Sequence, residues 1–205
     1  GLLQTSRGTI RYNGAPVQGL NRGVGFVTQR DNLLPWKTVE DNVGLALEIA
    51  HVKREERQRR VREFIDLVGL TGFDKHYPAE LSGGMRKRVG LARTLIYDPE
   101  TILMDEPFGA LDAHTRTRLQ NDLLNIWERD RKTVLFVTHS VEEAVFLSDK
   151  VVMMTRSPGR IRQIIDIDLP RPRRRTELLL DPRYQKYVVD IERMFDDSGD
   201  DELRP

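Results

Sequence analysis

The chain has 205 residues and carries 33 Lys and Arg against 32 Asp and Glu, a formal net charge of +1 at pH 7. This balance favours neither a nucleic-acid binder nor an enzyme for acidic substrates. Cysteine is absent, which excludes a disulfide framework and a cysteine-ligated zinc site and suits a reducing compartment. No apolar stretch approaches the roughly 18 residues of a membrane span. If the protein works at a membrane, we expect other chains to provide the crossing.

The first forty residues predict a small antiparallel element and a short strand. Thr9–Tyr12 alternates in polarity like a half-exposed strand, and Asn13-Gly14 is a strong hairpin turn signal. Gly23–Gln29 predicts a short buried strand that carries the amide of Gln29 at its end. An apolar patch follows this amide. Trp36, within it, belongs either to an interface for a partner helix or to the cover of an inserted lobe.

Residues 38–98 predict a series of helices. Thr38 has the form of a helix cap, and an apolar stripe closed by Gly69 follows (Val61, Phe64, Ile65 and Val68). The mixed-charge run KREERQRR at 53–60 predicts a solvated helix face rather than a nucleic-acid site, because no aromatic residue interleaves with its arginines.

A Ser-Gly-Gly turn opens the next helix at Ser82, Gly83 and Gly84. Its apolar spacing ends at Asp98-Pro99, which cannot continue a helix. Glycines let a ligand approach the backbone closely, and the unpaired N–H groups of a first turn favour an anion. The turn therefore indicates phosphate binding.

Two predicted strands end in residues that can carry chemistry. Thr101–Met104 is a short apolar run, compatible with a strand buried on both faces, that stops at Asp105 and Glu106. Thr133–Thr138 is a second apolar strand, and His139 stands at its end. A lone histidine is usually structural. Because the carboxyl ends of parallel strands meet at one edge of a sheet, we expect these acids and His139 to converge there.

The C-terminal part predicts a hairpin over 151–167, a basic run at 171–175 and a final helix. The run RPRRR either forms a solvated linker or contacts lipid head groups. Apolar residues at helical spacing (Tyr184, Tyr187, Val188, Ile191 and Phe195) predict a helix packed on the body, followed by an acidic, disordered end.

Residues 81–112, LSGGMRKRVGLARTLIYDPETILMDEPFGALD, resemble the signature motif, Walker B strand and D-loop of ATP-binding cassette (ABC) ATPases. The resemblance implies an α/β fold of the P-loop NTPase (RecA-like) class. Such a fold has a mostly parallel sheet core, an inserted α-helical subdomain and an N-terminal antiparallel element. Its segments would be a core portion over 1–37 that ends in the Q-loop, a helical subdomain over 38–98, a core portion over 99–170, and a linker, helix and tail over 171–205.

The resemblance also implies roles for the strand-end residues. Glu106 would polarise the attacking water, and His139 would contact the γ-phosphate of ATP. Asp105 and Gln29 would hold Mg²⁺, the second cofactor.

The signature residues Ser82, Gly83 and Gly84 would complete the nucleotide site of a second copy in a head-to-tail homodimer, and Asp112 would lie in the D-loop along that interface. Met85 replaces the usual glutamine of the motif. We expect nucleotide binding to survive, since the serine hydroxyl and backbone N–H groups still reach a phosphate.

The sequence contains no G-x-x-x-x-G-K-[ST] phosphate loop, and the glycine-rich stretch Gly19–Gly25 lacks the Lys-Ser/Thr ending. We therefore expect that these residues lack an N-terminal part of the functional protein, and that on their own they are inactive as an ATPase.

The stretches at 22–43 and 153–161 look most like the ATPases of nitrate, sulfonate and taurine importers. This resemblance implies transmembrane permease subunits, an extracytoplasmic solute-binding protein and a peripheral location on the cytoplasmic face of the inner membrane, with no nucleic acid as partner. Two alternatives are a soluble ABC-type ATPase of DNA repair or translation and a non-hydrolysing regulatory cassette. The first usually carries coiled-coil insertions or tandem cassettes, which this sequence does not show. The intact Glu106 and His139 speak against the second, which a true absence of the phosphate loop would favour.

Overall fold

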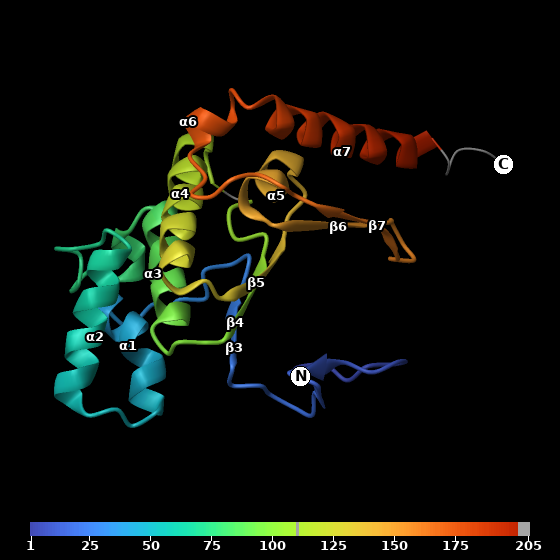
Figure 1. Cartoon of the computed structure of the whole chain (residues 1–205). Helices are drawn as coiled ribbons and strands as arrows, with labels where there is room; N and C mark the ends of the chain where they lie inside the picture. The colour runs from blue at the N-terminus through green and yellow to red at the C-terminus, as the bar shows by residue number, and fades with distance from the viewer. Residues whose placement is uncertain (110, 201–205) are drawn as a thin grey trace. The chain divides into compact units, whose positions relative to one another are not determined.

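The computed structural model describes residues 1–109 and 111–200, which fall into two compact units (Figure 1). The first unit is Gly1–Met104 with Lys132–Leu135, and the second is Asp105–Arg131 with Phe136–Pro205. These units cut the chain elsewhere than the predicted segments do, so the division into 1–37, 38–98, 99–170 and 171–205 stays a prediction.

A two-stranded hairpin opens the first unit, as the sequence predicts. Strand β1 (Arg11–Tyr12) pairs antiparallel with β2 (Ala15–Pro16). The connecting residues Asn13 and Gly14 both have positive φ, 48° and 79°, as a type I′ turn requires. The side chain of Asn13 and the hydroxyl of Tyr12 both donate hydrogen bonds to Glu100 (3.0 and 3.1 Å), which holds the hairpin to the body of the unit.

A three-stranded sheet contains β3 (Val24–Val27), β4 (Thr101–Asp105) and β5 (Thr133–Val137), in that order. Strand β3 runs parallel to β4, with Val24 opposite Thr101 and Val27 opposite Met104. Strand β4 buries Ile102 and Met104, whereas Phe26 in β3 and Leu135 in β5 are exposed. The buried strand predicted at 23–29 is therefore buried on one face only.

Three helices lie side by side in the first unit (Figure 1). They are α1 (Val39–Ile49), α2 (Arg54–Leu67) and α3 (Gly83–Leu95), with a short 3-10 turn, η1 (Pro78–Glu80), before α3. Thr38 caps α1 by accepting the N–H of Asp41 (3.3 Å). The predicted stripe of α2 is buried at Val61 and Ile65. Gly69 has φ +66° just beyond the helix, as its predicted closing role needs.

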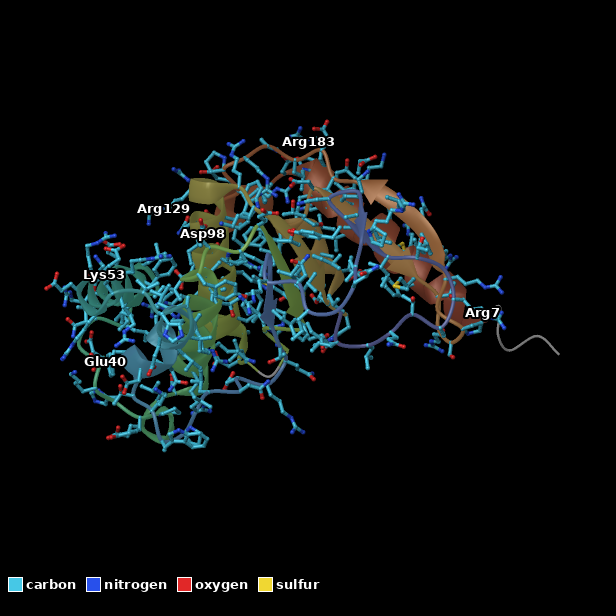
Figure 2. All side chains as sticks on the ribbon, turned by 90° about the horizontal axis from the view of Figure 1, so that it is seen from below. Arg7, Glu40, Lys53, Asp98, Arg129 and Arg183 are labelled. Atoms are coloured by element: carbon cyan, nitrogen blue, oxygen red, sulfur yellow. The ribbon has the colours of Figure 1, made fainter. Side chains whose placement is uncertain are left out.

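Most of the charged run at 53–60 is exposed, as the predicted solvated face requires, although Arg60 donates to the carbonyl of Ile96. Lys53, labelled in Figure 2, is exposed directly before α2. Arg59 pairs with Glu56 (2.6 Å) and Glu63 (2.5 Å) on the same face. Such spacing at three and four residues lets opposite charges neutralise one another along a helix.

The second unit has its own hydrophobic core. Its elements are α4 (Ala113–Asp130), α5 (Val141–Leu147), β6 (Lys150–Met154), β7 (Ile161–Asp166), α6 (Arg175–Leu178) and α7 (Pro182–Asp200). Strands β6 and β7 pair antiparallel as the predicted hairpin, and α7 packs on α5 (Figure 1). The core residues are Leu124, Val145, Phe146, Val151, Met153, Ile167, Leu169, Leu178, Tyr184 and Ile191.

Tyr184 and Ile191 confirm that the final helix packs on the body, although Phe195 at its end is 47% exposed. Helix α7 continues to Asp200, and the rest of the predicted acidic end lies outside the described residues. Within residues 1–109 and 111–200, no helix has both the length and the apolar character needed to span a bilayer.

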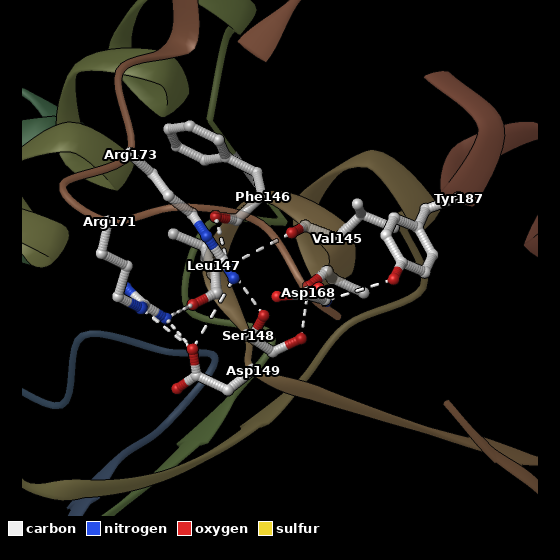
Figure 3. A network of polar contacts seen from close by, with 10 residues as sticks. Val145, Phe146, Leu147, Ser148, Asp149, Asp168, Arg171, Arg173 and Tyr187 are labelled. Atoms are coloured by element: carbon white, nitrogen blue, oxygen red, sulfur yellow. Dashed lines mark hydrogen bonds and ion pairs between the residues drawn. The ribbon is translucent and has the colours of Figure 1, made fainter. Parts of the chain in front are cut away.

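The basic run at 171–175 is not a solvated linker, so that prediction is wrong: residues of the run pack against the end of α5. Arg173 is 4% exposed and donates to the carbonyl oxygens of Phe146 (3.1 Å) and Ser148 (2.7 Å) at the end of α5 (Figure 3). Arg171 pairs with Asp149 (2.7 Å). The carbonyls of a last helical turn have no partner within the helix, and these guanidinium groups supply one. The charge of the run predicted that its arginines face solvent. The unpaired carbonyls at the end of α5 need donors, and this need placed Arg171 and Arg173 against the helix instead.

Candidate functional site

The acids after β4 stand in a constrained turn. Asp105 ends the strand, and Glu106 has φ +41°. The backbone N–H of Glu106 donates to the carbonyl of Val137 (3.0 Å), and its carbonyl accepts from Gly109 (3.2 Å). A left-handed conformation costs a residue other than glycine about 1–3 kcal/mol and persists only where its surroundings enforce it. The turn therefore fixes Glu106 at the expense of backbone strain, a feature common at functional sites.

Glu106 contacts His139, the residue at the end of the second predicted strand. Oε2 of Glu106 lies 3.2 Å from Nδ1 of His139, and the two side chains are 30% and 73% exposed. A carboxylate and an imidazole in contact, both open to solvent, can orient a water molecule and accept or share its proton. The predicted convergence is present for this pair, while the roles of the two residues stay predictions.

An aromatic contact fixes the loop after the acids. Phe108 is 5% exposed, and its ring centroid lies 5.8 Å from that of Phe136 in β5. Asp112 ends the loop and caps α4, where it accepts the N–H groups of Thr115 (3.0 Å) and His114 (3.1 Å). These hydrogen bonds, above all that from Thr115, hold the pKa of the Asp112 carboxyl below its usual value. Its predicted place in a D-loop stays a prediction, and Ala110 lies outside the described residues.

Ser82 opens α3 as predicted. Its hydroxyl accepts the N–H of Met85 (3.3 Å), and Ser82 is exposed while Gly84 is buried. Met85 thus interacts with the turn through its backbone. The first turn of α3 keeps the backbone donors that an anion needs.

Gln29 is exposed directly after β3, and the loop that it begins is fastened to α3. Lys87 donates from Nζ to the carbonyl of Gln29 and pairs with Asp31 (3.0 Å). Arg86 also pairs with Asp31 (3.2 Å), and Arg93 donates to the carbonyl of Asn32 (2.9 Å). Burial lowers the pKa of Arg93. We call these contacts the α3 clamp. Three basic residues on one helix were the only sign of it in the sequence.

The segment after this loop is held by Asn42, a residue that the sequence analysis did not single out. Asn42 is fully buried in α1. It accepts the N–H of Leu34 (2.8 Å) and donates to the carbonyls of Leu34, Lys37 and Thr38 (3.0–3.1 Å). Trp36 remains 71% exposed. Of the two interpretations of Trp36, the cover of the lobe core is therefore wrong, because the side chain faces solvent.

The strand-end residues fit a metal ion that arrives with a phosphate ligand. Among the described residues, no three His, Asp or Glu side chains form a cluster that could hold a metal. Mg²⁺ typically takes one or two carboxylates, keeps several waters and uses substrate phosphates for the rest of its shell. The exposed carboxylate of Asp105 at a strand end matches that pattern of donors.

These features define a class of protein. A strand in a parallel pair that ends in two acids, a histidine after a further strand and a helical lobe with a Ser-Gly-Gly turn are the parts of an ATP-binding cassette, a P-loop NTPase fold. A protein-family model described as ABC transporter matches residues 1–109. The chain belongs to the ABC transporter family.

Individual relatives narrow the comparison. The chain is 50% identical over 191 residues to an uncharacterized ABC transporter ATP-binding protein of Methanocaldococcus jannaschii, which covers 93% of this chain and 71% of the relative. It is 51% identical to the taurine import ATP-binding protein TauB of Rhizobium johnstonii (83% and 65%). It is 42% identical to the aliphatic sulfonates import ATP-binding protein SsuB of Bacillus cereus (94% and 76%).

Solved structures agree on the fold. A dimeric ATP-binding cassette in a post-hydrolysis state bound to ADP and Pi matches with a TM-score of 0.69 and 29% identity, over 82% of this chain and 77% of that one. A dimeric bacterial ABC transporter cassette matches with a TM-score of 0.70 and 30% identity over the same shares. The fold class expected from the sequence is therefore confirmed.

Proposed function

We propose that this chain belongs to the ATP-hydrolysing subunit of an ABC importer for a small anion of the nitrate, sulfonate or taurine type. The observation that carries the proposal is the contact between Glu106 and His139 at the ends of two strands. The names of the relatives, which are import ATP-binding proteins for taurine and aliphatic sulfonates, support the transport role.

The strand-end residues divide the work of hydrolysis. Bound Mg²⁺ supplies charge neutralisation on the phosphates, which is the main requirement of phosphoryl transfer. Asp105 and Gln29 are the residues that would hold this ion. Glu106 orients a water molecule and takes its proton, and the strained turn keeps the carboxylate in place for that purpose. His139 can exchange a hydrogen bond with Glu106 through Nδ1 and contacts the γ-phosphate.

A second copy completes the nucleotide site. In a head-to-tail homodimer the first turn of α3, with Ser82, Gly83 and Gly84, faces the phosphates held by the other copy, and Asp112 lies along the interface. The solved structures of similar cassettes are described as dimeric, which supports this arrangement. ATP closes the pair and hydrolysis loosens it.

The loop after Gln29 couples this cycle to permease subunits in the membrane. Its contacts with α3 tie it to the helix that Ser82 opens, so a shift of α3 reaches the loop through Lys87 and Arg86. The exposed Trp36 lies just beyond the loop and offers an apolar surface to a permease helix. The subunit would act peripherally at the cytoplasmic face of the membrane, and an extracytoplasmic solute-binding protein would deliver the anion.

The 205 residues contain no Lys-Ser/Thr phosphate loop, so we propose that they are inactive by themselves. Purified residues 1–205 are expected to show no ATP turnover, and the full-length gene product is expected to show it. Turnover by the 205 residues alone would contradict this part of the proposal.

The Glu106→Gln variant of the full-length gene product tests the assignment of the base. The amide keeps the shape of the side chain but cannot take a proton, so the variant is expected to bind ATP, dimerise and lose hydrolysis by about 100-fold or more. Glu55→Gln, on the exposed face of α2, is the matched control and should hydrolyse ATP like the parent protein. Undiminished hydrolysis by Glu106→Gln would remove Glu106 from its role.

Purification from membranes tests the transport role separately. The tagged full-length product is expected to co-purify with a multi-span membrane protein, and Trp36→Ala is expected to weaken that association. Purification of the product without any multi-span membrane protein would favour the alternative of a soluble ABC-type ATPase.

A further inference from the structure

A buried residue, Glu143, forms hydrogen bonds with both chain neighbours of His139, one through its carboxylate and one through its backbone N–H. Glu143 in α5 is 5% exposed. It accepts a hydrogen bond from the hydroxyl of Thr138, the residue directly before His139. Its backbone N–H donates to the hydroxyl oxygen of Ser140, the residue directly after (3.3 Å). The N–H of Ser140 donates in turn to the Thr138 hydroxyl oxygen (3.0 Å). Both residues that flank His139 are therefore bonded to Glu143 and, through the N–H of Ser140, to each other.

The same carboxylate is connected to the C-terminal segment through α4. Gln120, 2% exposed, donates from Nε2 to Glu143 (2.8 Å) and accepts at Oε1 from Arg175 (3.0 Å). An amide has a donor end and an acceptor end. The guanidinium of Arg175 thus selects the orientation of the Gln120 amide in which its donor end faces Glu143.

The C-terminal segment also fixes the opposite end of α5. Arg173 donates to carbonyls of the last turn, and Arg171 donates to that of Leu147 (3.0 Å; Figure 3). The guanidinium of Arg171 also lies 4.1 Å from the ring centroid of Trp127. Burial and the neighbouring Arg171 lower the pKa of Arg173 to about 10, which leaves it charged at pH 7. Helix α5 is therefore held at both ends by residues 171–175 and their partners.

We propose that Glu143, Gln120 and Arg175 are positioning residues for His139, through which the C-terminal segment sets the rate of ATP hydrolysis. The proposal rests on the function proposed above. Groups that hold a reacting residue act on the rate by keeping it within a fraction of an ångström of its working place. A displacement of about 1 Å can lower the rate on the order of 100-fold.

Arg175→Ala in the full-length gene product is the first test, because this side chain is 25% exposed and reaches the network only through the amide of Gln120. We expect kcat to fall about 10-fold while the Kd for ATP stays close to that of the parent protein, and the melting temperature should fall only slightly, because Gln120 loses one donor. Arg174→Ala is the matched control, since this exposed neighbour pairs with Glu177 on the surface (3.3 Å), and it should leave kcat unchanged. An Arg175→Ala variant with the kcat of the parent protein would overturn the inference.

Rescue by a conservative variant separates positioning from general packing. Thr138→Val removes the hydroxyl at constant shape and is expected to lower kcat like Arg175→Ala, whereas Thr138→Ser keeps the hydroxyl and is expected to restore it. Equal kcat values for the Val and Ser variants would overturn the inference. Should Thr138→Val fail to fold, the pair Arg175→Ala and Arg174→Ala decides the matter.

A double-mutant cycle asks whether the network acts through His139. In single-turnover assays, Arg175→Ala is expected to add no further loss once His139→Ala is present, because a residue that acts through His139 has nothing left to position. The same fold-loss in both backgrounds would overturn the inference. Failure of the proposed function is distinguishable, since Glu106→Gln and His139→Ala would then both hydrolyse ATP like the parent protein.

Discussion

Two loops that follow strands of this protein are held in different ways. The loop after β3, which begins at Gln29, is held by the α3 clamp, in which Asp31 pairs with the partly exposed Arg86 and with the buried Lys87. The loop after β5, around His139, is held from inside by the buried Glu143.

The two kinds of contact differ in how much free energy it costs to break them. A partly exposed ion pair such as that of Arg86 with Asp31 contributes about 0–1 kcal/mol, since water can replace either partner. A buried polar group that loses its partner costs about 1–3 kcal/mol, since water cannot replace the partner. We therefore expect the first loop, with its partly exposed Arg86–Asp31 pair, to open more readily than the second. Three variants test this difference in order of decreasing effect.

Replacing Arg173 is expected to have the largest effect on stability. Arg173→Met fills the same space but leaves carbonyls at the end of α5 without donors, so the free energy of unfolding should fall by about 3 kcal/mol. Urea unfolding of the full-length protein measures it, with the exposed Arg174→Met as control. Equal unfolding free energies for the two variants would mean that the C-terminal segment does not hold α5.

Replacing Asn42 comes second. Asn42→Ala removes four hydrogen bonds within the first unit and is expected to lower the free energy of unfolding by about 2 kcal/mol. It should also speed amide hydrogen exchange at Leu34. Asn125→Ala, on the exposed side of α4, is the control. Unchanged exchange at Leu34 would show that other contacts hold the segment after Gln29.

Removing the charge of Asp31 should have the smallest effect on stability and the clearest dependence on salt. Asp31→Asn keeps an oxygen that can still accept from the buried Lys87, so it is expected to cost only about 1 kcal/mol. Raising the salt to about 1 M shortens the screening length to about 3 Å, so hydrogen exchange in the loop after β3 should quicken in the parent protein. Exchange around His139 should not change. Equal salt responses of the two loops would remove the distinction between them.

Much of the local structure could be predicted from the sequence, because its causes lie within a few residues. The hairpin needs only Asn13-Gly14, and the starts of three helices need only the hydroxyls of Thr38, Ser82 and Ser140, each within three residues of the N–H that it accepts. The contact of Glu106 with His139 could be anticipated from the rule that parallel strands end at one edge. The signature, Walker B and D-loop motifs were enough to identify the family.

The contacts that hold these residues in place could not be predicted in the same way. Lys87 reaches the carbonyl of Gln29 from 58 residues away, and Arg173 reaches that of Phe146 from 27. A run of arginines looks the same in the sequence whether its side chains face solvent or bind the end of a helix. Charge patterning alone therefore favoured a solvated linker at 171–175, which is wrong.

The sequence by itself determined the elements, their caps and the residues at the strand ends, because each depends on local hydrogen bonds and on the alternation of apolar and polar side chains. Only the tertiary structure decided which buried groups hold those ends. Unpaired carbonyls and carboxylates inside a fold take whichever donor the packing brings near them. Arg173 and Gln120 became such donors because α5 packs against the segments that carry them.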